Sequence, residues 1–426
     1  MENIINQNSN TKSTGNSLNF ILLISGQLVS TLGTSIFSFA LSLYVLDLIG
    51  SAIAFSTVLV LGLIPKIFVN MFAGVFIDRY SRKVIIVTAD ILSGITVLVF
   101  MVLISRYSGS LLLIISATVI LALFNSFFQL ALTASIPNIV EENRVLKSNS
   151  IMQAILASTN ILGPVLGALS YNLFGIWFVF LINGISFIVS GLSEIFLRFK
   201  TNTEFTVKSN NYFEEIKEGF IYINEQKIIK FLLKFVFIIQ IIGVPLIVLI
   251  VPYITYRILK VSSFQLSVIE ASWAVGMIIG SVLVGVQKSP NKLLKNFFVL
   301  LEFQALIIML CFFPIIPFFA KSTWIITIVF SILIVIVIIL NVMQSAPLLS
   351  YFQMNTPENI RARLFGVFNT VMMVAPPLGM WIYGIIMHRV VWPAIPVVSG
   401  LIMLLFSLYA SRNKHFKSFI ASLEKK

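Results

Sequence analysis

Charged residues and cysteine are both scarce in this chain of 426 residues. Asp, Glu, Lys and Arg make up 11% of the sequence, against about 25% in soluble domains. The only cysteine, Cys311, excludes an internal disulfide, and the two histidines, His388 and His415, do not have the spacing of metal ligands. The sequence contains no Gly-Lys pair, hence no phosphate-binding P-loop, and no zinc-protease or serine-elbow pattern. We therefore expect no cofactor, no metal site, no enzymatic activity and no ATP-driven step.

Apolar residues dominate instead. They form 58% of the chain, and the mean hydropathy is +1.01, which is typical of a polytopic membrane protein. Crossing a bilayer takes about 20 apolar residues per helix. The sequence predicts twelve such spans: 18–46, 52–77, 84–105, 110–136, 149–173, 175–198, 229–257, 265–287, 297–319, 323–352, 362–388 and 390–411.

The basic residues are distributed as membrane topology requires. The formal charge of +13 suggests a nucleic-acid partner at first sight, but Lys and Arg occur in short segments between apolar runs and do not form one continuous basic stretch. If the N-terminus is cytoplasmic, 23 of the 29 basic residues fall in inner segments and five in outer ones. This asymmetry predicts both termini in the cytoplasm, a location in a plasma membrane and no nucleic-acid partner.

The spans divide six and six around the longest polar interval. We predict a cytoplasmic tail at 1–17, a six-helix bundle at 18–198, a cytoplasmic linker with an amphipathic helix at 199–228, a second six-helix bundle at 229–411 and a cytoplasmic tail at 412–426. The expected fold class is therefore an all-α membrane protein with two six-helix bundles.

The two halves resemble each other weakly. A shift of 216 residues places Glu142 on Glu358 and Gly163 on Gly379, and a shift of 211 places Gly74 on Gly285. Such internal similarity is typical of transporters built from two parallel repeats.

A charged turn between the second and third spans carries the most specific pattern. Residues 74–83 follow the order glycine, three residues, Asp-Arg, two residues, Arg-Lys. This order resembles the signature loop of the major facilitator superfamily, in which the carboxylate can bond a helix N-terminus and the cations stay at the cytoplasmic face. The resemblance implies a gating latch, to which we assign Gly74, Asp78, Arg79, Arg82, Lys83 and Asp90.

The fifth span carries a second resemblance. Its run Gly163-Pro164-Val165-Leu166-Gly167 is similar to the Gly-Pro-x-x-Gly motif of exporters in that superfamily. Proline bends a helix, and glycines four residues apart admit a close neighbour. Together with the 74–83 turn, this motif favours export. A longer series resembles the macrolide-efflux and siderophore-exporter branch: Leu48-Ile49-Gly50-Ser51-Ala52, Ile64-Pro65-Lys66, the 74–83 turn, Ala89-Asp90 and the Pro-x-x-x-x-Glu-Asn-Arg loop after the fourth span. The fourth span differs from proton-coupled drug exporters because it lacks Lys and Arg and has only Asn125 and Gln129 as its larger polar residues.

Three ionisable residues lie well inside predicted spans, where each charge is costly. Lys66, near the middle of the second span, is a candidate cavity cation or else a tolerated cation beside water. Glu270 and Glu302 are candidates for proton coupling, since burial disfavours the charged form of a carboxyl group. The alternatives are an interfacial carboxylate for Glu270 and a pair with Lys295 for Glu302.

The remaining acidic residues of the spans have simpler expected roles. We expect Asp90 to pair with Arg79 or Arg82, and we expect Asp47 and Glu194 to be solvated at span ends. Polar residues on predicted cavity helices are the substrate-cavity candidates: Lys66, Asn125, Gln129, Asn160, Gln240 and Asn369.

These patterns predict a monomeric secondary transporter that exports an amphipathic, macrolide-like small molecule by alternating access in exchange for protons. Its partners would be the substrate, protons and the lipid bilayer. One alternative is an importer, or an exporter dedicated to one metabolite or siderophore, because fold fixes neither direction nor cargo. Another is a membrane sensor or enzyme that does not transport.

Overall fold

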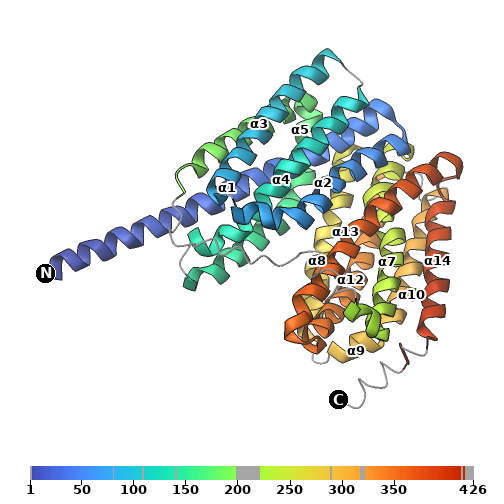
Figure 1. Cartoon of the computed structure of the whole chain (residues 1–426). Coiled ribbons are helices and arrows are strands. Elements are labelled where there is room, and N and C mark those ends of the chain that lie inside the picture. The colour runs from blue at the N-terminus through green and yellow to red at the C-terminus, as the bar shows by residue number, and fades with distance from the viewer. Residues whose placement is uncertain are drawn as a thin grey trace. The chain divides into compact units, whose positions relative to one another are not determined.

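The computed structural model describes residues 2–79, 81–107, 110–139, 142–197, 221–287, 290–316, 322–413 and 416–417. Over these residues the chain is helical and has no strand. It forms two compact units (Figure 1). Unit 1 comprises Met1–Ile49 and Leu61–Lys208, and unit 2 comprises Gly50–Val60 and Ser209–Lys426. Most of the predicted amphipathic linker helix lies outside the described residues.

Unit 1 is built from long apolar helices. They are α1 (Glu2–Ile49), α2 (Ala52–Arg79) from Leu61 onward, α3 (Arg82–Arg106), α4 (Leu111–Ile139) and α5 (Glu142–Glu194). Helix α1 already begins at Glu2, within the segment predicted as the N-terminal tail. Hydroxyl groups inside these helices donate to the carbonyl one turn earlier, as Ser126 does to Ala122. Such side chains need no partner on another helix.

Eleven helical stretches of the described chain are long and apolar enough to cross a membrane. One of them, Ile151–Glu194, has 44 residues and contains a break at Gly175, where φ is +76°. Glycine tolerates this left-handed conformation at no steric cost. The break falls between the predicted spans 149–173 and 175–198, so α5 accounts for both.

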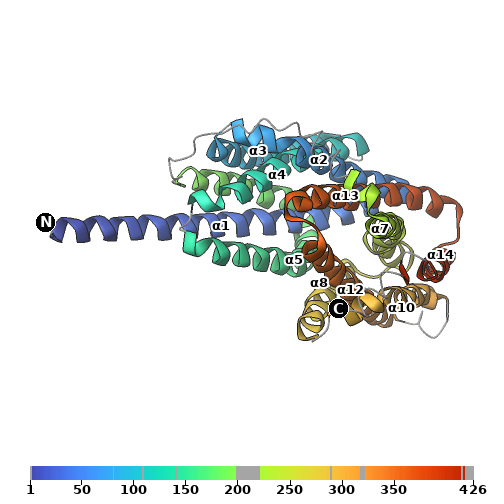
Figure 2. The same ribbon diagram turned by 60° about the horizontal axis from the view of Figure 1, so that its bottom comes forward.

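Close helix packing in unit 1 depends on glycine. Helix α5 packs along α1 and also against α3, as Figures 1 and 2 both show. A Cβ on Gly94 of α3 would lie 2.8 Å from the backbone oxygen of Gly184 on α5. A Cβ on Gly167 of α5 would lie 2.8 Å from the backbone oxygen of Ile36 on α1. These backbones are therefore in direct contact, and any larger residue would separate them.

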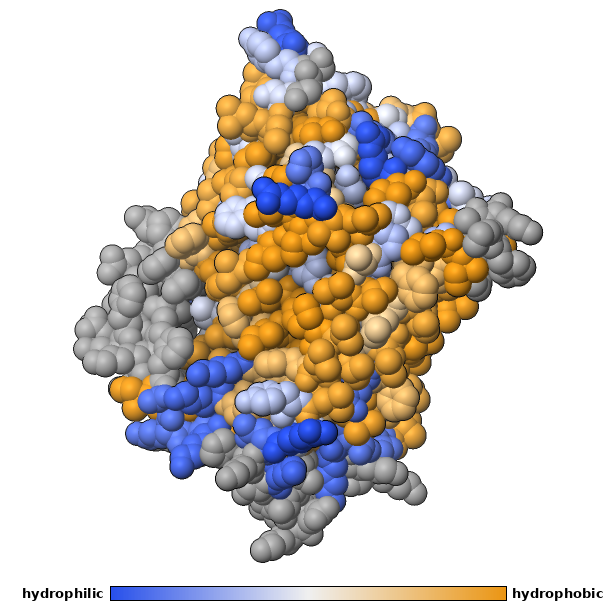
Figure 3. All heavy atoms as spheres, turned by 90° about the vertical axis from the view of Figure 1, so that its right-hand side faces the viewer, coloured by the Kyte–Doolittle hydropathy of each residue, from blue (hydrophilic) through white to orange (hydrophobic). Residues whose placement is uncertain are grey.

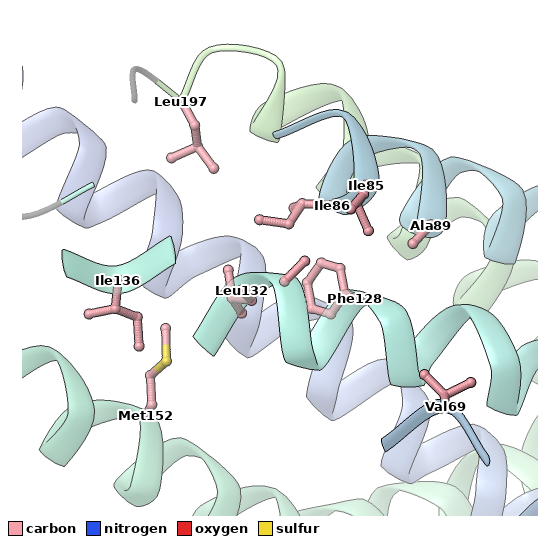
Figure 4. Close-up of a cluster of buried hydrophobic side chains, with 10 residues drawn as sticks. Val69, Ile85, Ile86, Ala89, Phe128, Leu132, Ile136, Met152 and Leu197 are labelled. Atoms are coloured by element: carbon pink, nitrogen blue, oxygen red, sulfur yellow. The ribbon is translucent and has the colours of Figure 1, made fainter. Parts of the chain in front are cut away.

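An apolar cluster fills the space between α3, α4 and their neighbours. It consists of Val69, Ile85, Ile86, Ala89, Phe128, Ala131, Leu132, Ile136, Met152 and Leu197 (Figure 4). All ten are at most 9% exposed. The cluster ends at Ala89, directly before the buried Asp90, so polar and apolar packing meet on α3.

Unit 2 repeats the plan of long apolar helices with short irregular turns. Its elements are α7 (Lys227–Pro245), η1 (Leu246–Ile250), η2 (Tyr253–Ile258), α8 (Ser263–Val286), α9 (Pro290–Lys295), α10 (Phe297–Met309), η3 (Leu310–Ile315), α12 (Thr323–Asn355), α13 (Glu358–Arg389) and α14 (Ala394–Ser411). Helix α7 packs on α13, α8 on α12, and α10 on α14.

The helix pairs of the two units correspond under the predicted repeat. The first half of α5 packs on α1 through Gly163, which contacts Ser35. Its repeat partner Gly379 lies on α13 and contacts Ile241 and Pro245 of α7. Glycine thus occupies the closest point of the equivalent helix pair in each unit, as expected if the two units derive from one repeat.

The span that contains α7 widens near its end. Its last two turns, η1 and η2, are π-helical and follow Pro245 and Pro252. Proline has no N–H to donate to the preceding turn, and π-turns often occur where a helix serves a function. Figure 3 shows a face on which apolar residues predominate and hydrophilic residues gather mainly toward the two ends, as expected of a protein in a bilayer.

Candidate functional site

The exporter-like motif lies where α5 meets α1. The hydroxyl of Ser35 on α1 donates to the backbone oxygen of Thr159 at 3.0 Å. Gly163 lies so close to Ser35 that even a methyl group would overlap its side chain. Pro164 has no N–H, which frees the carbonyl of Asn160 one turn earlier. The motif therefore fixes a close contact between two helices and a local bend in one of them.

The four candidate cavity residues of unit 1 share one property. Lys66, Asn125, Gln129 and Asn160 make no side-chain hydrogen bond to the described residues. Lys66 and Asn160 are exposed, and Asn125 and Gln129 are partly buried. Amides and ammonium groups are costly in hydrocarbon unless water or a ligand satisfies them. These side chains therefore fit a water-lined path better than a lipid-facing surface.

The two candidates of unit 2 lie on adjacent helices. Gln240 of α7 donates from Nε2 to the sulfur of Met372 on α13, at 3.4 Å. Asn369, one turn earlier on α13, is exposed. The structure thus brings these two polar residues to the same pair of helices, although the sequence gives no direct sign of this proximity.

The two proton-coupling candidates have different surroundings. Glu302 of α10 is partly buried and accepts a hydrogen bond from Ser407 of α14 at 3.4 Å. Glu270 of α8 is partly buried and has no hydrogen bond to the described residues. Among the described residues, Glu302 thus has one hydroxyl donor and Glu270 has none.

The predicted latch is described only in part. Helix α2 ends at Arg79 and α3 begins at Arg82, which bounds the turn, but the side chains of Gly74, Asp78 and Arg79 lie outside the described set. Lys83 is partly buried. Arg82 donates from Nη1 to the backbone oxygen of Ala134 on α4 at 2.7 Å. One latch cation therefore bonds a carbonyl of the neighbouring helix.

Asp90 is not paired with Arg82, and Arg79, the other partner that the sequence suggested, lies outside the described side chains. Asp90 is 1% exposed, two turns beyond Arg82, and its Oδ1 accepts from Ser30 of α1 at 3.5 Å. The expected pair with Arg82 is wrong in this structure, because Arg82 points to Ala134. The structure therefore gives no contact between Asp90 and Arg82 that would support a role for Asp90 in the latch.

Glu194 also differs from expectation. It was predicted to be solvated at a span end, as the exposed Asp47 is, but it is only 2% exposed. It interacts electrostatically with Asp90. The prediction failed because Glu194 ends α5 on the face that packs against α1. A sequence signal was available: Ser186, Ser190 and Glu194 recur every four residues, which places them on one helix face.

A second group of contacts lies at the start of α2, within unit 2. The hydroxyl of Tyr253 donates to the backbone oxygen of Gly50, and the Arg257 guanidinium lies against the same glycine. Ser56 of α2 touches Gly384 of α13. Sequence reasoning did not identify these residues, because nothing in the pattern relates residue 50 to residue 253.

The described residues contain no group of three His, Cys, Asp or Glu that could hold a metal ion. What the site offers is therefore closely packed helices, unsatisfied polar groups along apolar spans and buried carboxyl groups.

Comparisons with known proteins agree with this architecture. The family model of the Major Facilitator Superfamily matches residues 23–379. Macrolide efflux protein A of Streptococcus pyogenes is 25% identical over 274 residues, which are 63% of this chain and 66% of that protein. The uncharacterized MFS-type transporter YkuC of Bacillus subtilis (strain 168) is 28% identical over 221 residues, 50% of this chain and 51% of its own. The chain thus spans slightly less than two thirds of the first relative's length and about half of the second's.

Solved structures share the fold across nearly the whole chain. A bacterial homologue of the iron transporter ferroportin gives a TM-score of 0.66 at 14% identity, covering 93% of this chain and 99% of that one. A nucleoside transporter, NupG, gives 0.71 at 11% identity, covering 92% and 98%. These similarities confirm the predicted all-α membrane fold, and at such low identity they carry no information on cargo.

Proposed function

Because the chain belongs to the Major Facilitator Superfamily, we propose that it exports amphipathic small molecules of the macrolide type across a bacterial plasma membrane in exchange for protons. The chain is a multi-pass membrane transporter and not an enzyme. The observation that carries export is the similarity to macrolide efflux protein A over 274 residues. Two features of the structure support it independently.

The first feature is the contact between α5 and α1. Gly163 and Gly167 bring these helices into backbone contact, and the Ser35 hydroxyl bonds across it. A helix pair this close excludes water and substrate from the space between its members. It fits a wall that seals one side of a cavity while the other side opens.

The second feature is the set of unsatisfied polar groups on apolar helices. Lys66 and Asn160 in unit 1 and Asn369 in unit 2 are exposed on membrane-spanning helices. A large amphipathic molecule needs apolar contact together with a few polar groups for orientation. These side chains, with Asn125, Gln129 and Gln240, are the proposed substrate contacts.

Helix α2 supplies the mechanical element for alternating access. Its first residues, Ala52–Val60, belong to unit 2, and the remainder from Leu61 belongs to unit 1. Within unit 2 the start of α2 contacts Gly384 through Ser56, and we propose that α2 bends between these two parts during transport. We assign the 74–83 turn, with Arg82 bonded to Ala134, as the latch at the other end of the same helix.

Proton exchange is proposed to use Glu270 or Glu302. The sequence has no nucleotide-binding loop, so a gradient must supply the energy. We expect Glu270→Gln or Glu302→Gln to abolish gradient-driven transport while substrate binding remains, because the amide keeps the shape and cannot carry a proton. The exposed Glu225→Gln serves as the control. Proton movement on substrate addition that is normal in both variants would place coupling elsewhere.

The test of export uses everted membrane vesicles from a bacterium that lacks its own drug pumps. In everted vesicles an exporter moves its substrate into the lumen. When the lumen is made acidic, vesicles that carry the chain should accumulate a radiolabelled macrolide, and a protonophore should release it. Gly163→Val should abolish accumulation by forcing α5 away from α1. Gly243→Ala is the matched control, since nothing lies within 4 Å of a Cβ placed there. Accumulation by right-side-out vesicles alone would indicate import and contradict the proposal.

The proposed orientation has a separate test. Both termini are proposed to lie in the cytoplasm, on the basis of the Lys and Arg distribution. A green fluorescent protein fused after residue 426 should fluoresce, and an alkaline phosphatase fused there should be inactive. A dark fluorescent protein together with an active phosphatase would show that the C-terminus lies outside the cytoplasm and would contradict the proposed orientation.

A further inference from the structure

Two carboxyl groups meet inside unit 1. Asp90 comes from α3, two turns after its start, and Glu194 is the last residue of α5. They are 1% and 2% exposed, and they interact electrostatically. Ala89, the residue before Asp90 on α3, belongs to the apolar cluster of Figure 4.

Glycine brings the three helices together at this point. A Cβ on Gly26 of α1 would lie 3.4 Å from Glu194 Oε1 and 3.4 Å from Ser190 Oγ. A Cβ on Gly191 of α5 would lie 3.3 Å from the Cβ of Asp90. A side chain at Gly191 would therefore press on α3 beside Asp90, and one at Gly26 would contact Glu194.

The pair has too few hydrogen-bond donors to be doubly ionised. The Ser190 hydroxyl faces the Glu194 carboxyl at 3.4 Å, the Gly26 carbonyl at 3.4 Å and the Asp90 carboxyl, but it holds one hydrogen. Ser30 offers one more hydrogen to Asp90, at 3.5 Å. These distances are long for hydroxyl donors. Asp90 Oδ2 and Glu194 Oε2 are buried and have no hydrogen-bond partner among the described residues.

Charged neighbours do not make up the deficit. On α3, Lys83 lies seven residues before Asp90, Arg82 begins the helix and donates to Ala134, and Arg106 ends the helix. Over residues 24–49 of α1 the titratable groups are Tyr44 and Asp47, near its far end, and over 111–136 of α4 there are none. Over 151–194 of α5 the only one besides Glu194 is Tyr171, which bonds Asp47. Among the described side chains, each carboxyl group is thus the other's only ionisable neighbour.

We propose that Asp90 and Glu194 form a proton-binding site in unit 1, in which the two carboxyl groups hold one shared proton. A protonated carboxyl becomes a donor, which supplies the missing hydrogen bond and removes one of two like charges. Ser30 and Ser190 act as positioning residues. Release of the proton requires water to reach the pair, and separation of α5 from α1 provides that access. The use of this site in coupling rests on the proposed proton exchange, whereas the bound proton itself does not.

The test is infrared difference spectroscopy on the full-length protein in lipid nanodiscs. At neutral pH the wild type should show the C=O band of a protonated carboxyl group, with a shift in D2O. Asp90→Asn and Glu194→Gln should each change or remove that band. Asp47→Asn, at an exposed carboxylate bonded to Tyr171, should leave it unchanged. A band identical in wild type and both variants would overturn the proposal.

A second variant keeps the test decisive if either substitution prevents folding. Ser190→Ala removes a donor that favours the charged form, so its band should persist to higher pH than in wild type. An unchanged titration in this variant would contradict the proposal.

Two further results would show that something other than a proton neutralises the pair. A band that emerges only when sodium is replaced by a bulky organic cation would identify a sodium site. Absence of any band in wild type would mean that both carboxyl groups are ionised, for example against a basic residue of 198–220. Either result overturns the shared proton.

Vesicle transport separates this inference from the proposed function. If wild type accumulates macrolide but its band does not depend on Asp90 or Glu194, the inference fails and the function stands. If the band depends on them but no macrolide accumulates, the function fails and the proton site stands. If both hold, Glu194→Gln should flatten the dependence of accumulation on pH.

Discussion

The hydroxyl of Tyr253 lies 3.0 Å from the backbone oxygen of Gly50 and donates a hydrogen bond to it. Tyr253 begins the π-helical turn η2, and Gly50 joins α1 to α2 with φ at +64°. The Arg257 guanidinium covers the same glycine. A backbone carbonyl in a left-handed turn is thus tied to an irregular stretch of helix.

Tyr253→Phe should loosen this turn without disturbing the fold. One hydrogen bond contributes about 1 kcal/mol, which corresponds to about a fivefold change in the population of the open turn. In a Cys311→Ala background carrying Ser51→Cys, alkylation by a maleimide should become about fivefold faster. Tyr409→Phe is the control, because Tyr409 is 73% exposed. Equal alkylation rates in the two variants would show that the bond does not hold the turn.

Gly384→Ala should damage the contact between α13 and α2. The added methyl group would overlap Ser56, and overpacking of this kind costs about 1–3 kcal/mol. A lower thermal midpoint and weaker transport are expected, and Ser56→Gly in the same protein should restore both. Gly366→Ala, on the same helix with open space around it, should have no effect. Failure of the double variant to recover would mean that the damage has another cause.

For the buried pair Gln304 and Gln344 we predict that the stability losses of the two single substitutions do not add in the double variant. Gln344 Nε2 donates to Gln304 Oε1 at 2.9 Å, between α12 and α10, and both side chains are buried. Gln344→Leu leaves an amide without its partner and should cost about 1–3 kcal/mol of stability. The double variant with Gln304→Leu should lie close to wild type, since neither polar group is then unsatisfied. Additive losses in thermal unfolding would argue against this pairing.

Lys66→Met tests whether the ammonium group serves transport. Lys66 is exposed, makes no hydrogen bond to the described residues, and corresponds to Met277 in the repeat. Removing a charge that costs roughly 2.5–3.5 kcal/mol at a span centre should preserve or raise the thermal midpoint. If Lys66 contacts cargo, efflux should still fall at equal protein level. Lys234→Met, at an exposed position of α7, is the control, and unchanged efflux in Lys66→Met would leave Lys66 a tolerated cation.

The sequence predicted the features that depend on local pattern. Spans of about 20 apolar residues give the helices, and Gly175 separates the two spans of α5 where the sequence placed a boundary. Gly163 and its repeat partner Gly379 lie at close helix contacts, as glycine in a membrane helix suggests. These features follow from residue type and spacing alone.

The features that depend on which helix faces which could not be predicted in the same way. Asp90 was expected to pair with Arg79 or Arg82 of the nearby charged turn, but Arg82 lies two turns away and reaches α4 instead. Glu194 was expected in water because it ends a span, yet Gly26 on another helix leaves room for it to be buried. Hydropathy places a residue along the membrane normal and says nothing about the neighbour across a helix interface.

The division of α2 between the two units has a consequence for biosynthesis. Gly50 and its hydrogen-bond partner Tyr253 are 203 residues apart in sequence, and Gly384 is synthesised later still. While the ribosome completes the first six spans, the start of α2 has none of the partners it has in unit 2. An emerging chain must therefore keep this segment inserted but unpaired in the lipid until the later helices arrive. Truncated chains that end before residue 253 are expected to be substrates for membrane quality-control proteases, even though most of unit 1 is present in them.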